Sequence, residues 1–298
     1  MDTYKRLFKY TPEKIHCVYI SALCAVLGVA SQMGAFWFLW KFLYALLVTK
    51  NVTDGSMYAT VIVSLLAGYS IVYFGALWAS HVLGFRLESN LRKTAIKHLM
   101  NASFAFFDMN PSGKIRKLID DNAQETHMLV AHLIPDNISA LFTPIFMFII
   151  VFAVDVKLGF LLLGVALIGG AQMMFMMGNK NFMQKYQAAL ERMNAEAVEY
   201  VRGMQIVKIF KSTVESFKAF YEAITGYSDL AYKYTLSCRT PYVMFQVLFN
   251  LFAVFTIPAA IYFMNKGADG NLIIAKIVFF VCIAGILFSA FMRVMYVG

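Results

Sequence analysis

Apolar residues gather in six long runs along the chain, and polar residues gather in the segments between them. Each run has about 20 residues or more, the length that an α-helix needs to cross the hydrocarbon core of a bilayer. We therefore predict six membrane-spanning helices, which cover residues 15–48, 57–84, 134–154, 158–178, 241–264 and 272–298.

The connectors between these runs alternate between short and long. The two long ones follow the second and fourth runs and cover residues 85–133 and 179–240. Both carry apolar residues at helical spacing, namely Leu87, Leu91, Ile96 and Leu99 in the first and Phe182, Tyr186, Ala189, Leu190, Met193 and Ala197 in the second. A helix of about 20 residues is about 30 Å long, so we predict long helical extensions outside the bilayer.

Composition and charge support a membrane protein. Hydrophobic residues make up 60% of the 298 residues and charged residues 14%, against about 25% charged in a soluble domain. The net charge of +9 comes mostly from the N-terminal tail and the two long connectors. The basic residues thus sort by membrane side, which argues against a nucleic-acid partner and predicts a cytoplasmic N-terminus and cytoplasmic long connectors in a plasma or inner membrane.

Each long connector contains a break in its helical pattern. In the first, FFDMNPSGKIRKLIDDN (106–122), proline and glycine interrupt the helix, and Asn110 or Ser112 can cap a short helix over 113–122 with Ile115 and Ile119 on one side. In the second, VEYVRGMQIVKIFKS (198–212), Gly203 interrupts the helix. We predict a short helix at the tip of each extension, parallel to the membrane, where a partner could dock.

These two tips closely resemble the coupling-helix regions of the transmembrane domains of ABC exporters, the six-helix type IV class. The resemblance covers essentially the whole chain and includes VDVKLG between the third and fourth runs. It implies an all-α polytopic membrane protein, an ABC type-1 transmembrane domain with six transmembrane helices, long cytoplasmic extensions and two coupling helices. The tip residues that it singles out are Pro111, Ser112, Gly113, Lys114, Ile115, Arg116 and Asp120 in the first and Val201, Arg202, Gly203, Met204, Val207 and Lys208 in the second.

The resemblance also implies partners. Such a domain works as a homo- or heterodimer with a second transmembrane half and is driven by ABC ATPase (nucleotide-binding) domains. The chain has no GxxxxGK[ST] or LSGGQ-like stretch, so we expect residues 1–298 to form one transmembrane domain without catalytic residues or a cofactor of its own. ATP and Mg²⁺ would bind to an ATPase domain, fused downstream or separate, and the sixth helix is expected to continue beyond Gly298.

Uncharged polar residues inside the predicted spans are candidates for lining a substrate pathway. They are Gln32, Tyr69, Tyr73, Gln172, Gln246 and Asn250. Packing between helices is the alternative explanation, because a lone polar side chain in a membrane seeks either a partner or a wet cavity.

Other polar residues suggest less. His127, His132 and Asp136 could suggest a metal, but His127 lies off the face that the other two share and no fourth ligand has matching spacing, so we predict no metal site. Lys41 and Lys276 lie near a span end, where we expect their side chains to extend to the membrane surface. We find no charge at mid-membrane, which argues against a proton- or ion-coupled carrier. The four cysteines are expected to be buried free thiols: Cys17, Cys24, Cys238 and Cys282.

The sequence thus predicts one half of the translocation pathway of an ATP-driven transporter, with export favoured. Two alternatives remain open. One is an importer of metal-chelating siderophores built on the same exporter-like fold, and the other is a regulatory membrane subunit that transports nothing. Neither the substrate nor the direction follows from the sequence.

Overall fold

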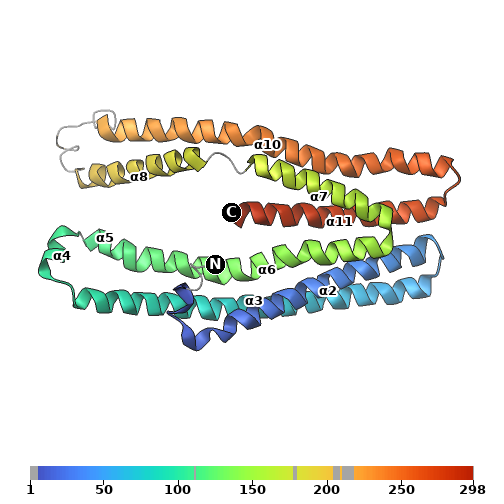
Figure 1. Ribbon diagram of the computed structural model, residues 1–298, viewed down its shortest axis with the longest axis horizontal. Coiled ribbons are helices and arrows are strands. Elements are labelled where there is room, and N and C mark those ends of the chain that lie inside the picture. Colours follow the sequence, from blue (N-terminus) through green and yellow to red (C-terminus); the bar gives the residue numbers. More distant parts are fainter. Residues whose placement is uncertain (1–5, 111, 177–179, 204–208, 210–217, 298) are drawn as a thin grey trace. The chain divides into compact units, whose positions relative to one another are not determined.

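The computed structural model describes residues 6–110, 112–176, 180–203, 209 and 218–297, and these residues are mostly helical (Figure 1). The elements are η1 (Pro12–Lys14), α2 (His16–Leu47), α3 (Val52–Met100), α4 (Phe104–Met109), α5 (Ser112–Arg116), the π-helical turn η2 (Lys117–Asp121), α6 (Asn122–Val154), α7 (Val156–Met176), α8 (Lys180–Arg202), α10 (Lys218–Asn265) and α11 (Gly270–Val297). The prediction of an all-α protein is confirmed.

Among the described residues, four helices are long and apolar enough to cross a membrane. They contain the segments Pro12–Leu47, Val52–Met100, Ile119–Val154 and Gly270–Met292. The two other predicted spans, 158–178 and 241–264, overlap in part with shorter apolar helical segments, Val156–Gln172 and Val254–Asn265.

The chain divides into two compact units, one made of Met1–Leu163 with Phe255–Gly298 and the other of Gly164–Val254. In the first unit, α2 packs along α3, both contact α6, and α11 packs against α2 and α6. Small residues are buried along these helices, including Ala25, Gly28 and Ala79. Small side chains let membrane helices approach closely, which strengthens van der Waals packing where no hydrophobic effect is available. A core cluster joins Cys17, Ala79, Leu83, Leu87, Val130 and Ile134.

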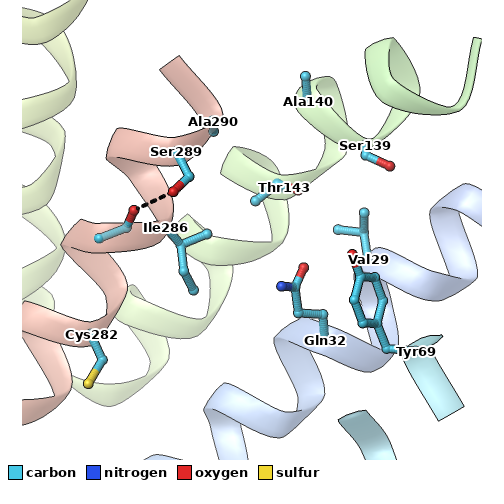
Figure 2. A pocket seen from close by; sticks show the side chains of 11 residues that line it. Val29, Gln32, Tyr69, Ser139, Ala140, Thr143, Cys282, Ile286, Ser289 and Ala290 are labelled. Carbon is cyan, nitrogen blue, oxygen red and sulfur yellow. Dashed lines mark hydrogen bonds between the residues drawn. The ribbon is translucent and has the colours of Figure 1, made fainter. Parts of the chain in front are cut away.

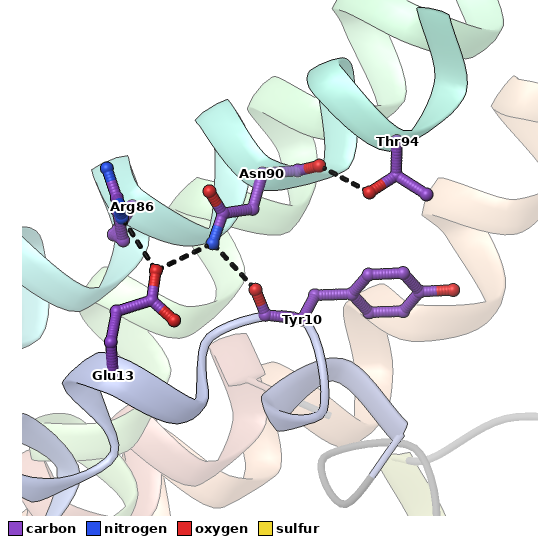
Figure 3. Close-up of polar contacts among 5 residues, drawn as sticks. All are labelled: Tyr10, Glu13, Arg86, Asn90 and Thr94. Carbon is purple, nitrogen blue, oxygen red and sulfur yellow. Dashed lines mark hydrogen bonds and ion pairs between the residues drawn. The ribbon is translucent and has the colours of Figure 1, made fainter. Parts of the chain in front are cut away.

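The N-terminal segment is attached to the last third of α3 (Figure 3). The Asn90 side-chain amide donates to the Tyr10 carbonyl at 2.7 Å and to Glu13 Oε1 at 3.0 Å. Arg86 Nε donates to the same Glu13 oxygen at 2.7 Å. These contacts place the 3₁₀ helix η1 beside α3, ahead of the first turn of α2.

Asp155 explains the polar break between α6 and α7. Its Oδ1 accepts hydrogen bonds from the backbone N–H groups of Lys157 at 2.8 Å and Leu158 at 3.3 Å, which caps α7. Its Oδ2 forms an ion pair with Lys276 on α11. Lys276 on α11 therefore has a carboxylate partner at the connector between α6 and α7.

The first extension differs from the prediction at its tip. The long helix α3 ends at Met100, so the break comes about ten residues before Pro111, and the short helix α4 follows it. From Ser112 the backbone stays helical through η2 and α6 to Val154. The prediction of a separate helix over 113–122 is thus wrong. Residues with helical propensity continue directly into α6 once the turn at Asn110 has been made.

Three of the four apolar residues predicted as a stripe on the first extension are buried or half-buried, and Leu99 is one of the half-buried ones. Leu87 is buried and Leu91 packs against the core cluster, whereas Ile96 is 51% exposed.

The second unit contains α8 and most of α10, which lie alongside one another (Figure 1). Aromatic rings join them: Phe182 stacks on Tyr234 with centroids 5.8 Å apart, and Tyr200 stacks on Phe220 at 5.2 Å. The hydroxyl groups of Tyr186 and Tyr227 lie 2.9 Å apart. The stripe predicted from Phe182 to Ala197 is half-buried in the structure, so this part of the sequence prediction is confirmed.

Candidate functional site

Four helices of the first unit surround a cavity of about 250 Å³ (Figure 2). Gln32 comes from α2, Tyr69 from α3, and Ser139 and Thr143 from α6. The remaining lining residues are Val29, Ala140, Cys282, Gly285, Ile286, Ser289 and Ala290. The cavity is therefore lined by helices that are widely separated in the sequence.

Close contact between α2 and α3 places Tyr69 on the cavity wall. A Cβ atom on Gly28 would lie 3.5 Å from the Tyr69 ring, so the ring rests directly on the glycine backbone. Ser31 lies one turn after Gly28 on α2, and Leu65 lies one turn before Tyr69 on α3. The Ser31 Oγ donates a hydrogen bond to the Leu65 carbonyl at 2.8 Å. Such a hydrogen bond between helices fixes their relative register.

The cavity wall is polar but uncharged. Gln32 offers an amide, Tyr69, Ser139, Thr143 and Ser289 offer hydroxyl groups, and Cys282 offers a thiol. The Ser289 hydroxyl already donates to the Gly285 carbonyl at 3.1 Å (Figure 2). Ser139 Oγ, on a residue that is only 3% exposed, has no hydrogen-bond partner among the described atoms. A ligand with neutral hydrogen-bonding groups would suit this wall, whereas a buried unpaired charge would be costly there.

The structure separates the six residues that the sequence suggested for the pathway. Gln32 and Tyr69 line the cavity. Tyr73 is one turn beyond Tyr69 on α3, and its ring stacks on Tyr69 with centroids 5.7 Å apart. The Tyr73 hydroxyl donates to Asp136 Oδ1 at 2.7 Å, so Tyr73 supports the wall through another side chain.

The other three candidates, Gln172, Gln246 and Asn250, belong to the second unit and bond within it. Gln172 donates to the Pro241 carbonyl at 3.4 Å, Gln246 to the Tyr242 hydroxyl at 2.8 Å, and Asn250 to the Gln246 carbonyl at 2.8 Å. Each of these amides therefore has a partner inside its own unit.

At the first tip, acidic and basic side chains connect η2 to α3. Arg92 Nε lies 3.3 Å from Asp120 Oδ1, and Arg116 Nε lies 3.9 Å from Asp120 Oδ2. Gly113 is exposed and Ile115 half-buried. Ser112 and Lys114 lie in α5, and Pro111 lies outside the described residues.

At the second tip, α8 ends with Val201 and Arg202, and Gly203 follows. Val201 is exposed, and Arg202 forms an ion pair with Glu199 at 2.9 Å. Met204, Val207 and Lys208 lie outside the described residues.

Sequence reasoning missed several residues that the fold brings together. Cys282 lines the cavity and is exposed, which makes the expectation of a buried thiol wrong at this position; Cys17 is buried, Cys24 and Cys238 are half-buried, and all four are free. Ser139, Thr143 and Ser289 gave no signal beyond being small polar residues in apolar runs. His81 was missed because its neighbours, His127 and His132, come from another helix.

The chain matches the family model of the ABC transporter transmembrane region over residues 18–291. It is 28% identical over 153 residues to the mycobactin import ATP-binding/permease protein IrtA of Mycobacterium tuberculosis, which covers 51% of this chain and 18% of that protein. It is 29% identical over 142 residues to the protein of the same name from Mycolicibacterium smegmatis, covering 47% of this chain and 16% of that protein.

A third protein of that name, from Mycolicibacterium thermoresistibile, is 25% identical over 194 residues, which is 62% of this chain and 21% of the relative. The chain thus spans about a fifth of the length of the curated relatives it matches. The family match covers nearly the whole chain and agrees with its apolar helices. The chain is a multi-pass membrane protein that belongs to the ABC transporter transmembrane-region family.

Proposed function

We propose that this chain forms half of the translocation pathway of an ATP-driven transporter and that the cavity between α2, α3, α6 and α11 binds the transported ligand. The observation that carries the proposal is the cavity wall, where uncharged hydrogen-bonding groups converge between apolar helices. Polar side chains inside a membrane domain face a partner or a pathway, and Ser139 Oγ has no such partner among the described atoms.

We assign ATP hydrolysis to a partner domain. ATP and Mg²⁺ would bind to an ABC ATPase domain, and the residues of the two tips would transmit its closure to the helices. The relatives are named ATP-binding/permease proteins, which supports such a domain on the same polypeptide or in the same complex. A second transmembrane half would complete the pathway, and the basic N-terminal tail and long connectors support a cytoplasmic position for both tips.

Import is the direction that we favour over the export expected from the resemblance. All three relatives described above carry mycobactin import in their names. The uncharged cavity suits a ligand whose own charges are neutralised, as in a metal chelate. Export of an amphipathic compound is the competing outcome.

The test is reconstitution of the complete transporter, this chain with its ATPase and its second half, in proteoliposomes. Iron-loaded mycobactin is offered on the side opposite the ATPase, and its ATP-dependent accumulation on the ATPase side is measured. Import predicts such accumulation together with stimulated ATP hydrolysis. Accumulation in the opposite direction would reverse the assignment, and ATP-independent behaviour would refute transport altogether.

Variants connect the activity to the cavity. We expect Gln32→Ala and Tyr69→Ala each to weaken ligand-stimulated ATPase activity about tenfold, which corresponds to the loss of one or two ligand hydrogen bonds. Gln187→Ala is the matched control, since Gln187 is exposed on α8. Equal activity in all three variants would mean that the ligand binds elsewhere.

A further inference from the structure

Three histidines from two helices meet between α3 and α6. The His81 ring lies with its centroid 5.5 Å from that of His127 and 4.9 Å from that of His132. Phe85, which is 62% exposed, lies beside His127 with the two ring centroids 4.3 Å apart. The remaining two histidines of the chain, His16 and His98, are exposed. His127 is buried, whereas His81 and His132 are half-buried, and we name these three residues the histidine cluster.

One carboxylate lies beside His127, and a second belongs to a residue one helical turn after His132 on α6. Glu88 Oε2 lies 3.4 Å from His127 Nδ1, with side chains that are 13% and 7% exposed. His127 Nδ1 has no hydrogen-bond partner among the described atoms, so this pair becomes a full ion pair only when the imidazole is protonated. Gly84 makes room for it, since a Cβ there would lie 3.0 Å from His127 Nδ1.

Asp136 follows His132 by one helical turn on α6, and residues at this spacing share a face. Asp136 accepts the hydrogen bond from the Tyr73 hydroxyl at 2.7 Å. The Tyr73 ring stacks on Tyr69, which lines the cavity. The contacts from Asp136 through Tyr73 therefore reach Tyr69 on the cavity wall.

The elements around the histidine cluster contribute the following charged and titratable groups. From α3 come Glu88 and Arg92, whose Nη2 lies 2.8 Å from Glu88 Oε1. From η2 comes Asp120, which contacts Arg92. Cys17 of α2 belongs to the adjacent core cluster. On α11, Lys276 is paired with Asp155 at the opposite end of α6.

Imidazole is the side chain whose ordinary ionisation falls between pH 5 and 8. Positive charges on imidazoles this close repel one another, so one protonated ring is favoured over two or three. A single imidazolium on His127, by contrast, has the Glu88 carboxylate to pair with. In the described part of the chain, no three His, Cys, Asp or Glu side chains are arranged to hold a metal ion.

We infer that the histidine cluster binds one shared proton between Glu88 and Asp136 and that this proton adjusts the cavity. A proton near His132 attracts the Asp136 carboxylate in competition with the Tyr73 hydroxyl, and Tyr73 carries the stacked Tyr69 ring. A proton on His127 attracts Glu88 in competition with Arg92, which contacts Asp120 at the first tip. The same proton thus acts on the cavity and on the tip, and its effect on transport rests on the function proposed above.

Proton sharing is tested by nuclear magnetic resonance of ¹⁵N-histidine in the complete transporter in lipid nanodiscs, titrated without ligand between pH 5 and 8. We expect the signals of His81, His127 and His132 to titrate together, and His127→Gln to alter the curves of the other two. The curves of His16 and His98 should not change, and His98→Gln is the matched control. Independent titration of all five histidines would overturn the inference.

The link to the cavity is tested by the pH profile of ATPase activity stimulated by iron-loaded mycobactin. The wild-type profile should change several-fold between pH 5.5 and 8, in the range where imidazole ionises. His127→Gln and Asp136→Asn should flatten it, while His98→Gln should preserve it. A cluster variant that retains the wild-type profile overturns the link. Absence of stimulation at every pH counts against the proposed function, while the ligand-free titration still decides the proton site.

Discussion

Asp155 and Lys276 form an ion pair that ties the connector between α6 and α7 to the beginning of α11, across 121 positions of sequence. Both side chains are largely buried, and Asp155 also caps α7 through two backbone N–H groups. Three segments of the first unit thus depend on one carboxylate.

Removing one partner of this pair should destabilise the fold. We expect Lys276→Met and Asp155→Asn each to cost about 1–3 kcal/mol, because a polar group is left buried without its partner. The midpoint of thermal unfolding in detergent measures the effect. Asp54→Asn, at an exposed helix start, is the matched control and should change the midpoint little. The double variant should be less destabilised than the sum of the single variants, and simple additivity would show that the pair does not interact.

The same carboxylate makes stability depend on pH. Burial alone would raise the pKa of Asp155, but the hydrogen bonds from Lys276 and from the backbone of Lys157 and Leu158 outweigh it and hold the pKa below its ordinary value. A lowered carboxyl pKa contributes stability above the unfolded-state pKa of about 3.9, and this contribution is lost as the pH falls through the folded-state value. The difference in unfolding midpoint between wild type and Asp155→Asn should therefore stay constant from pH 7 to about pH 4 and shrink below it. A difference that persists at lower pH would contradict this account.

Gly84 is expected to tolerate no larger side chain. A Cβ atom there would lie 3.0 Å from His127 Nδ1 and 3.3 Å from the His127 carbonyl oxygen. Gly84→Ala should cost about 1–3 kcal/mol through overpacking, although alanine favours helices by about 1 kcal/mol over glycine. Gly75→Ala on the same helix would place its Cβ 3.9 Å from Cys24 Sγ and should be neutral or stabilising. The midpoints of thermal unfolding of the two variants test this prediction. Equal midpoints would show that α3 and α6 accommodate the added methyl group at no cost in free energy.

Asn90 should hold the N-terminal segment more firmly than Glu13 does. Glu13 contributes an exposed ion pair with Arg86, and such pairs contribute about 0–1 kcal/mol. Asn90 additionally donates to the Tyr10 carbonyl. Amide hydrogen exchange over residues 6–15 should therefore accelerate more in Asn90→Ala than in Glu13→Ala. Lys93→Ala, an exposed change on the same helix, should leave exchange unaltered, and faster exchange in Glu13→Ala than in Asn90→Ala would reverse the ranking.

Cys282 should react first with thiol reagents. It is exposed and lines the cavity, whereas Cys17 is buried. In single-cysteine variants of the complete transporter, we expect maleimide to label Cys282 at least tenfold faster than Cys17, since reaction requires access to the thiol. Iron-loaded mycobactin should slow labelling of Cys282 and leave Cys238 unaffected. Equal rates with and without that ligand would place its binding site away from α11.

The amino-acid sequence by itself determined the helical class, the apolar stretches and the stripe from Phe182 to Ala197 on α8. These features depend on local composition and on the spacing of apolar residues within one helix. The structure of the first tip could not be predicted from the sequence, because residues 113–122 favour a helix whether they form a separate element or extend α6. In the structure these residues extend α6, because the backbone stays helical through η2.

Only the tertiary structure decided which polar residues meet. Tyr73 and Asp136 are 63 positions apart, and His81 meets His127 and His132 only because α3 and α6 present these side chains to one another. Such meetings depend on how each helix is rotated about its axis and on its register along its neighbour. Close contacts over Gly28 and Gly84 set both, since a shift by one residue turns a helix by about 100° and separates the pairs.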